Sequence, residues 1–230
     1  MCKEPFLMKN LRVNIEISPE LYLKNPDTSE LGQSILSYSI ELISEIGFEA
    51  FTFKKLGEVI KSPESSIYRY FKNKHSLLVY LTSWYWYWTE YRLVFATINI
   101  DEPKERLIRS LDILTKPVLI DNSFSYINEV KLSEIIFSES IKAYHTVEVD
   151  KENEKGCFKA YKGVVQRVGS IILEISPGYK YPHMLISTVI EGAHQQHYFS
   201  QHLPALTDTN KGGGAISEFY KELTLKALEL

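Results

Sequence analysis

The chain has 230 residues, of which 44% are hydrophobic and 24% charged, and its formal net charge is −3. This is the composition of an ordinary globular protein of one or two domains, and its mild acidity excludes a protein that coats nucleic acid nonspecifically. The sequence lacks an apolar run near the ~20 residues of a membrane span, the apolar core of a signal peptide and the cysteines of a disulfide framework. We therefore expect a cytoplasmic protein that contacts no membrane.

Residues 1–28 predict an N-terminal arm. Between residues 9 and 23, apolar side chains alternate with polar ones before Pro19, a period of two that is typical of a short strand. A lone strand needs a partner, so the arm would dock on the body of the protein or on a second subunit. The alternative is a loosely ordered tail.

Residues 29–80 predict a domain of short helices. Asp27-Thr28-Ser29 caps a long helix that ends at Gly47, and Thr52 takes the N-cap position of a second helix over residues 52–60. Ser62-Pro63 repeats the start signal, which predicts a third helix over about 63–71. The two-residue connection between the second and third helices is typical of a helix-turn-helix, in which the last helix protrudes to read DNA.

Positive charge is concentrated in the same segment. Residues 52–80 hold six basic and two acidic residues, a local net charge of +4 in a chain of −3. Contact with DNA phosphates requires such a concentration. The face of the third helix that we expect to be exposed carries Glu64, Ser65, Ser66, Tyr68 and Arg69.

Further residues complete a recognisable pattern: Gly47-Phe48, Thr52, Leu56, the run from Ser66 to Phe71, Lys72-Asn73-Lys74 and Leu77-Leu78. With them, roughly residues 30–80 resemble the DNA-binding domain of TetR-type transcriptional regulators. The resemblance implies a homodimer that binds a palindromic double-stranded DNA operator, most simply a repressor that a small-molecule effector releases. The residues expected to bind DNA are Thr52, Lys55, Glu64, Ser65, Ser66, Tyr68, Arg69, Lys72 and Lys74.

Within that set, Thr52, Tyr68 and Lys74 are expected on phosphates. The residues expected to face bases are Glu64, Ser65, Ser66 and Arg69.

Two positions depart from the family pattern. The family has glycine at the turn position of Lys61, where a left-handed conformation costs another residue about 1 kcal/mol. This predicts a turn of different shape. The recognition helix starts with Pro63 and Glu64 where the family has small and often basic residues. A carboxylate repels phosphate, although it can accept from cytosine N4, so the alternative function is a helical ligand- or protein-binding module with a degenerate DNA-binding domain.

Residues 81–230 predict a helical domain for effector binding and dimerisation. The last two helices could pair with their copies as a four-helix bundle, as in TetR-type proteins, and thereby hold two reading helices roughly 34–36 Å apart. The alternative is that they close the core of the monomer. The pattern of caps and apolar stripes favours an all-α protein. It predicts helices over about 74–95, 103–116, 126–144, 156–175, 182–202 and 215–229, with a charged, helix-poor segment at 150–155.

Five consecutive aromatic residues, from Trp84 to Trp88, point to all sides of their helix. One interpretation is an aromatic junction between the DNA-binding domain and the body. The other is a pocket for a small apolar effector, lined by Trp84, Trp88, Tyr91, Phe137 and Tyr161.

A metal or catalytic site has little support. Glu191 and His194 have the Glu-x-x-His spacing of helical di-metal proteins, but a second such pair is missing from the sequence. The sequence also lacks a nucleophile triad, a P-loop and a dinucleotide fingerprint. We expect no metal, no cofactor and no catalytic residue, and an enzyme or metalloprotein is the last of the three hypotheses.

Overall fold

A computed structural model describes residues 15, 17–120, 124–209 and 214–230. Its α-helices are joined by short connections, and no strand occurs among these residues, which confirms the all-α prediction. None of the helices in the described part combines the length and apolar character that a membrane span needs. The helices are α1 Glu30–Ala50, α2 Phe53–Val59, α3 Glu64–Ile67, α4 Lys74–Thr97, α5 Pro103–Thr115, α6 Glu129–Tyr144, α7 Val149–Glu154, α8 Lys159–Ile175, α9 Pro182–His202 and α10 Gly214–Ala227.

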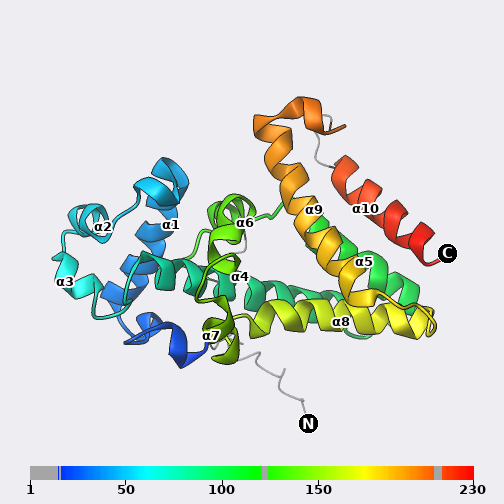
Figure 1. Ribbon diagram of the computed structural model, residues 1–230, viewed down its shortest axis with the longest axis horizontal. Coiled ribbons are helices and arrows are strands. Elements are labelled where there is room, and N and C mark those ends of the chain that lie inside the picture. The colour runs from blue at the N-terminus through cyan, green and yellow to red at the C-terminus, as the bar shows by residue number, and fades with distance from the viewer. Residues whose placement is uncertain (1–14, 16, 121–123, 210–213) are drawn as a thin grey trace, which may run out of the picture.

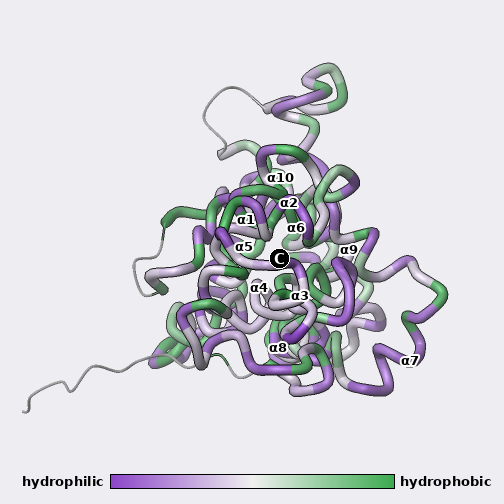
Figure 2. The backbone as a smooth tube through the Cα atoms, turned by 90° about the vertical axis from the view of Figure 1, so that its left-hand side faces the viewer, coloured by the Kyte–Doolittle hydropathy of each residue, from purple (hydrophilic) through white to green (hydrophobic). Residues whose placement is uncertain are grey.

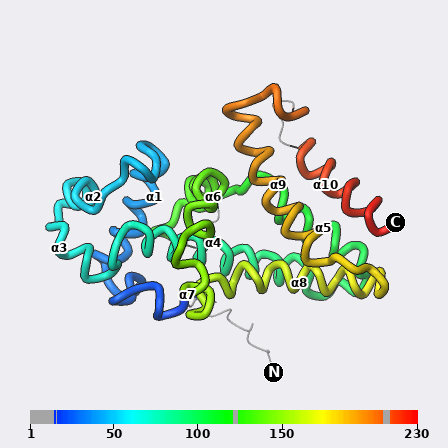
Figure 3. The backbone as a smooth tube through the Cα atoms, viewed as in Figure 1, coloured from blue at the N-terminus to red at the C-terminus, as the bar shows by residue number. Residues whose placement is uncertain are grey.

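Helix α4 connects the two ends of the elongated molecule (Figure 1). Helices α1, α2 and α3 lie at one end, and α5, α8, α9 and α10 lie at the other, with α6 between them. The body is built by packing of α4 against α5, α6 and α8, and of α9 against α8, α6 and α10. The tube in Figure 3 follows this path from the small N-terminal bundle into the body.

Local capping explains where the helices of the N-terminal bundle begin. The Ser29 hydroxyl accepts from the Gly32 amide at 3.2 Å, and the Thr52 hydroxyl accepts from the Lys55 amide at 3.2 Å. The carboxamide oxygen of Asn73 does the same for Ser76 at 2.8 Å, where α4 starts. Each cap satisfies an amide that has no partner within its helix. The predicted caps at Ser29 and Thr52 are confirmed.

The core explains the aromatic run. Trp84, Trp86 and Trp88 are all buried, because α4 is covered on several sides by other helices. In Figure 2 the hydrophilic stretch of α7 lies at the periphery instead. A helix that is apolar all round is therefore the central element of this fold.

Three predicted elements differ from the structure. The third helix spans Glu64–Ile67 rather than about 63–71, and Tyr68–Tyr70 form a turn. Pro63 takes the N-cap position that was predicted for Ser62, and no side chain caps this helix. The charged segment at 150–155 is largely the short helix α7, since its residues have adequate helix propensity without an apolar stripe. The chain turns at Gly47, where φ is +77°, but then resumes one helical turn up to Ala50. The helices predicted over 103–116, 156–175, 182–202 and 215–229 are found as α5, α8, α9 and α10.

The predicted strand of the N-terminal arm falls mostly on residues 9–14 and 16, outside the described residues. The described end of the arm packs on the N-terminal bundle and on α4. Ile17 and Leu21 are buried, and the Leu23 amide donates to the Tyr70 carbonyl at 2.8 Å. Short 3-10 helices at Pro19–Leu21 and Pro26–Thr28 carry the chain into α1.

Candidate nucleic-acid interface and cavities

Helices α2 and α3 are joined by a close turn at residues 60–63. Lys61 takes the left-handed φ of +53° that its side chain disfavours, so the predicted change in the shape of the turn is wrong. The Ser62 amide donates to the Gly57 carbonyl at 2.9 Å. A side chain at Gly57 would place its Cβ only 2.6 Å from the Ser62 carbonyl oxygen, so glycine is needed for this close approach. The turn therefore uses one glycine and one strained lysine.

Buried side chains hold the protruding helix in place. Leu56 of α2 and Ile67 of α3 are fully buried, and Phe71 closes the base of the bundle. The ring of Phe53 meets the ring of Tyr68 edge to face, with centroids 5.1 Å apart. The outer face of α3 is thereby left free for contact with another molecule.

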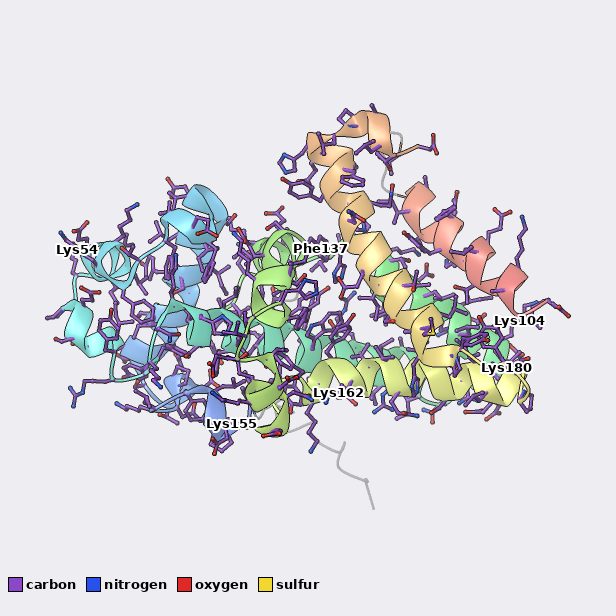
Figure 4. All side chains as sticks on the ribbon, in the orientation of Figure 1. Lys54, Lys104, Phe137, Lys155, Lys162 and Lys180 are labelled. Carbon is purple, nitrogen blue, oxygen red and sulfur yellow. The ribbon has the colours of Figure 1, made fainter. Side chains whose placement is uncertain are left out.

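The exposed residues at this end are mostly those that the sequence predicted. Thr52, Lys55, Ser65, Tyr68, Arg69 and Lys72 are exposed, whereas Glu64, Ser66 and Lys74 are half-buried. Lys54 (Figure 4) and Lys61 are also exposed here and were missing from the predicted set. Both lysines were among the six basic residues counted in residues 52–80. They were not chosen as DNA-binding residues because neither belongs to the family pattern.

Lys74 has a specific structural role. Its ammonium group donates to the carbonyl oxygens of Phe48, Glu49 and Phe51 at 2.9, 3.1 and 3.3 Å. Lys55 likewise donates to the carbonyl of Ala50 at 2.8 Å. Both lysines thus satisfy the carbonyl groups left open at the end of α1, where a positive charge also complements the helix dipole.

Glu64 and Tyr68 lie one turn apart on and just beyond α3. The Glu64 carboxylate beside the Tyr68 hydroxyl is the main cause that raises the pKa of Tyr68. The acidic residue at the start of α3 therefore has a partner within the reading surface. A DNA phosphate that took the Tyr68 hydroxyl would have to compete with this carboxylate.

The five residues predicted to line an effector pocket make different ring contacts. Trp84 stacks on Trp88 with centroids 6.2 Å apart, while Tyr161 stacks on Trp86 at 4.2 Å. Tyr91 is half-buried and lies against Phe95 at 4.4 Å. Only Phe137, among the five, lines the cavities described next.

Phe137 stands where α6 faces α9 (Figure 4). Its ring lies 4.3 Å from the ring of His194 and 5.4 Å from that of His197. We call this contact and the cavities around it the Phe137 seam. Three cavities of about 270, 360 and 310 Å³ share Phe137 as a lining residue.

The cavity of about 360 Å³ reaches the DNA-binding domain, since Ile43, Ser44 and Gly47 of α1 line it. The cavity of about 310 Å³ lies between α6 and α9, and we call it the α9-side cavity. Its lining comprises Phe137, Ser138, Ser140, Ile141, Glu191, His194, Gln195, Tyr198 and Phe199.

The two histidines of the seam are neutral at pH 7. Burial lowers the pKa of His194 to about 3, and burial also lowers the pKa of His197. His197 bonds through Nε2 to the Thr115 carbonyl at 2.8 Å, so Nε2 carries the hydrogen. In the described part of the chain, no three His, Cys, Asp or Glu side chains come close enough to hold a metal ion.

In this structure, buried side chains hold a close turn, a short exposed helix follows the turn, and a helical body carries both. This arrangement is that of a helix-turn-helix protein. A family model described as bacterial regulatory proteins, tetR family, matches residues 35–81. This segment is therefore a tetR-family DNA-binding domain, and the resemblance seen in the sequence is confirmed.

Solved structures share the overall fold at low sequence identity. The crystal structure of superantigen PfiT is similar with a TM-score of 0.56 and 16% identity, over 88% of this chain and 97% of that chain. The crystal structure of AibR in complex with isovaleryl coenzyme A and operator DNA is similar with a TM-score of 0.52 and 16% identity, over 83% of this chain and 96% of that chain. At this identity the likeness shows the fold alone. No curated protein matches the sequence significantly.

Proposed function

We propose that the protein is a dimeric transcriptional regulator that binds a palindromic operator and represses transcription until a small-molecule effector releases it. The observation that carries this proposal is the exposed outer face of α3 on a buried, tetR-type scaffold, within a segment of net positive charge. Residues 29–80 bind DNA in this proposal. Residues 81–230 bind the effector and the second subunit, and residues 1–28 form the arm.

The geometry refines the proposed role of each DNA-contacting residue. Tyr68 and Thr52 contact phosphates, and the exposed Lys54, Lys61 and Lys72 add positive charge around them. Lys55 and Lys74 support this surface indirectly, because their ammonium groups bind the carbonyl groups at the end of α1, which lies beside the DNA. Base edges are read by Ser65, Ser66, Arg69 and Glu64.

Selection of bound sequences from random DNA duplexes tests the proposal. We expect enrichment of a palindrome whose half-sites lie about one helical turn apart. Tyr68→Ala and Arg69→Ala should abolish the enrichment, whereas Lys180→Ala, an exposed lysine at the opposite end (Figure 4), should keep it. Absence of enrichment at low salt, where phosphate contacts are strongest, would contradict DNA reading.

A second function is favoured by Glu64. Its carboxylate engages Tyr68 on the reading surface and repels phosphate. In that case the protein is a helical ligand- or protein-binding module with a degenerate DNA-binding domain. The same selection separates the two functions: a Glu64→Gln variant that gains enrichment absent in the parent chain would favour the second.

A further inference from the structure

We infer that the effector of this protein is a neutral or cationic molecule with a flat apolar body and a hydrogen-bond donor, bound in the α9-side cavity of the Phe137 seam. The inference rests on the proposed effector control, and it names the site and the chemical class of ligand. It excludes anionic ligands such as an acyl coenzyme A from this site.

Size and shape fit a small organic molecule. The cavity of about 310 Å³ is at the lower end of the range for small-molecule sites, about 300–1,000 Å³. Phe137, Tyr198 and Phe199 line it with aromatic rings. These rings favour a flat, apolar partner that can lie against a ring face.

Charge selects against an anion. None of the described residues that line the three cavities of the seam is a lysine or an arginine, whereas Glu134 and Glu191 belong to the linings. Glu139 lines one cavity too, but Lys142 pairs with it at 2.7 Å. The neutral His194 offers no positive charge at pH 7 either. A coenzyme A thioester carries several phosphate charges, which the Glu191 carboxylate would repel.

A carboxylate in the lining favours a hydrogen-bond donor on the ligand, and a histidine adds a second polar contact. The Glu191 carboxylate lines the cavity and is held by the Tyr161 hydroxyl, which donates to it at 2.7 Å. His194 also lines the cavity, and its buried Nδ1 atom has no hydrogen-bond partner among the described residues. A neutral imidazole and a carboxylate can both accept a hydrogen bond, and the carboxylate also attracts a cation.

The position of the seam connects the ligand to the DNA-binding domain. Phe137, Ser138 and Tyr198 line both the α9-side cavity and the cavity of about 360 Å³. The latter is also lined by Ile43, Ser44 and Gly47 of α1. A ligand that displaces the Phe137 ring would therefore change the surface on which α1 rests.

Binding of matched probes tests the ligand class without DNA. We would measure intrinsic tryptophan fluorescence and calorimetry of the full chain with 2-aminoanthracene, proflavine, anthracene-2-carboxylate and isovaleryl coenzyme A. The two amines should bind with Kd values in the micromolar range. Binding of the carboxylate and the thioester should be about tenfold weaker or more, the effect of losing one charge-assisted hydrogen bond and gaining repulsion.

Substitutions test whether the probes bind in the α9-side cavity. Glu191→Gln should weaken cationic proflavine about tenfold, because the attraction of the carboxylate is lost. It should weaken neutral 2-aminoanthracene less, because the glutamine oxygen still accepts a hydrogen bond. Glu191 is exposed, so the change leaves the fold intact. Tyr161→Phe should have a smaller effect in the same direction. Phe137→Ala should weaken both amines. Glu154→Gln, on α7 and away from the seam, is the matched control and should change neither Kd.

The outcomes separate this inference from the proposed function. Anthracene-2-carboxylate binding as tightly as the amines, failure of both amines at about 1 mM, or a proflavine Kd unchanged in Glu191→Gln would overturn the ligand class. A dimer that binds the amines in the seam but keeps its full affinity for the selected duplex would overturn effector control and leave the binding site standing.

Discussion

His194 is a neutral residue in the core whose protonation opposes folding. It is buried against Phe137 and Trp86, and burial is the main cause that lowers its pKa to about 3. In the unfolded chain its pKa is about 6.5. The unfolded state therefore binds a proton below pH 6.5 that the folded state does not bind, and stability is lost as the pH falls from about 6.5 towards 3.

This difference predicts a loss of about 2 kcal/mol in the free energy of unfolding between pH 7 and pH 5, at about 1.4 kcal/mol per pH unit below 6.5. Urea unfolding of the parent chain and of His194→Leu at both pH values measures it. The loss should shrink in His194→Leu and persist in His202→Leu, since His202 is exposed on the same helix. An equal loss in all three proteins would contradict the assignment to His194.

At the scale of elements, the starts of α1 and α2 were predictable from their caps, whereas the predicted cap of α3 at Ser62 and its predicted end were wrong. Ser29 and Thr52 are caps, and a cap depends on neighbours within three residues. The end of α3 at Ile67 was missed because Tyr70 and Phe71 continue the apolar spacing. Tyr70 is buried although it lies outside the helix. Its hydroxyl forms a hydrogen bond of 2.8 Å with that of Ser29, and its carbonyl accepts from the Leu23 amide.

The two candidate sites also differ in whether they depend on neighbouring residues or on contacts between distant segments. The DNA-binding surface was predictable because it lies within one continuous segment. The seam was not, because it requires α6 and α9 to meet, and spacing within either helix says nothing of that contact. Phe137 was chosen for its aromatic ring, and His194 was noticed only for its spacing from Glu191.

Asp27 ties the start of α1 to the body. Its two carboxylate oxygens accept from the hydroxyl of Tyr80 on α4 at 3.0 Å and from that of Tyr126, before α6, at 2.9 Å. Burial, followed by the charge of Asp27, raises the pKa of both tyrosines. Both hydroxyls are therefore donors at neutral pH.

Asp27→Ala should lower the free energy of unfolding by about 1.5–3 kcal/mol, because two partly buried hydroxyls lose a charged acceptor. Urea unfolding measures this change. The control Asp150→Ala removes an exposed carboxylate on α7 and should change stability by less than about 0.5 kcal/mol. Equal stability of the two variants would show that the two tyrosine hydroxyls form hydrogen bonds to water that are as favourable as those to Asp27.

At the scale of the whole molecule, α9 and α10 both close the monomer and leave an apolar face uncovered. Gly192 of α9 lies against the Tyr220 ring of α10, so close that a Cβ at position 192 would collide with it. On the outer side of α10, Phe219 is 55% exposed and Leu223 is 39% exposed. The two interpretations of these helices are thus compatible, since one side of α10 packs on α9 and the other can face a second subunit.

Phe219→Glu should convert the proposed dimer to a monomer, because it places a carboxylate in an interface that needs roughly 1,000 Å² or more of buried surface. Sedimentation at micromolar concentration measures the state of assembly. Affinity for the selected palindrome should fall by about 100-fold or more, since one reading helix then binds without the effective concentration supplied by the other.

Phe95→Glu is the matched control: Phe95 is 60% exposed on α4, so its loss costs a similar apolar surface away from α10. A parent chain that sediments as a monomer, or a Phe219→Glu protein that stays dimeric, would place the subunit contact elsewhere and with it the spacing of the two reading helices.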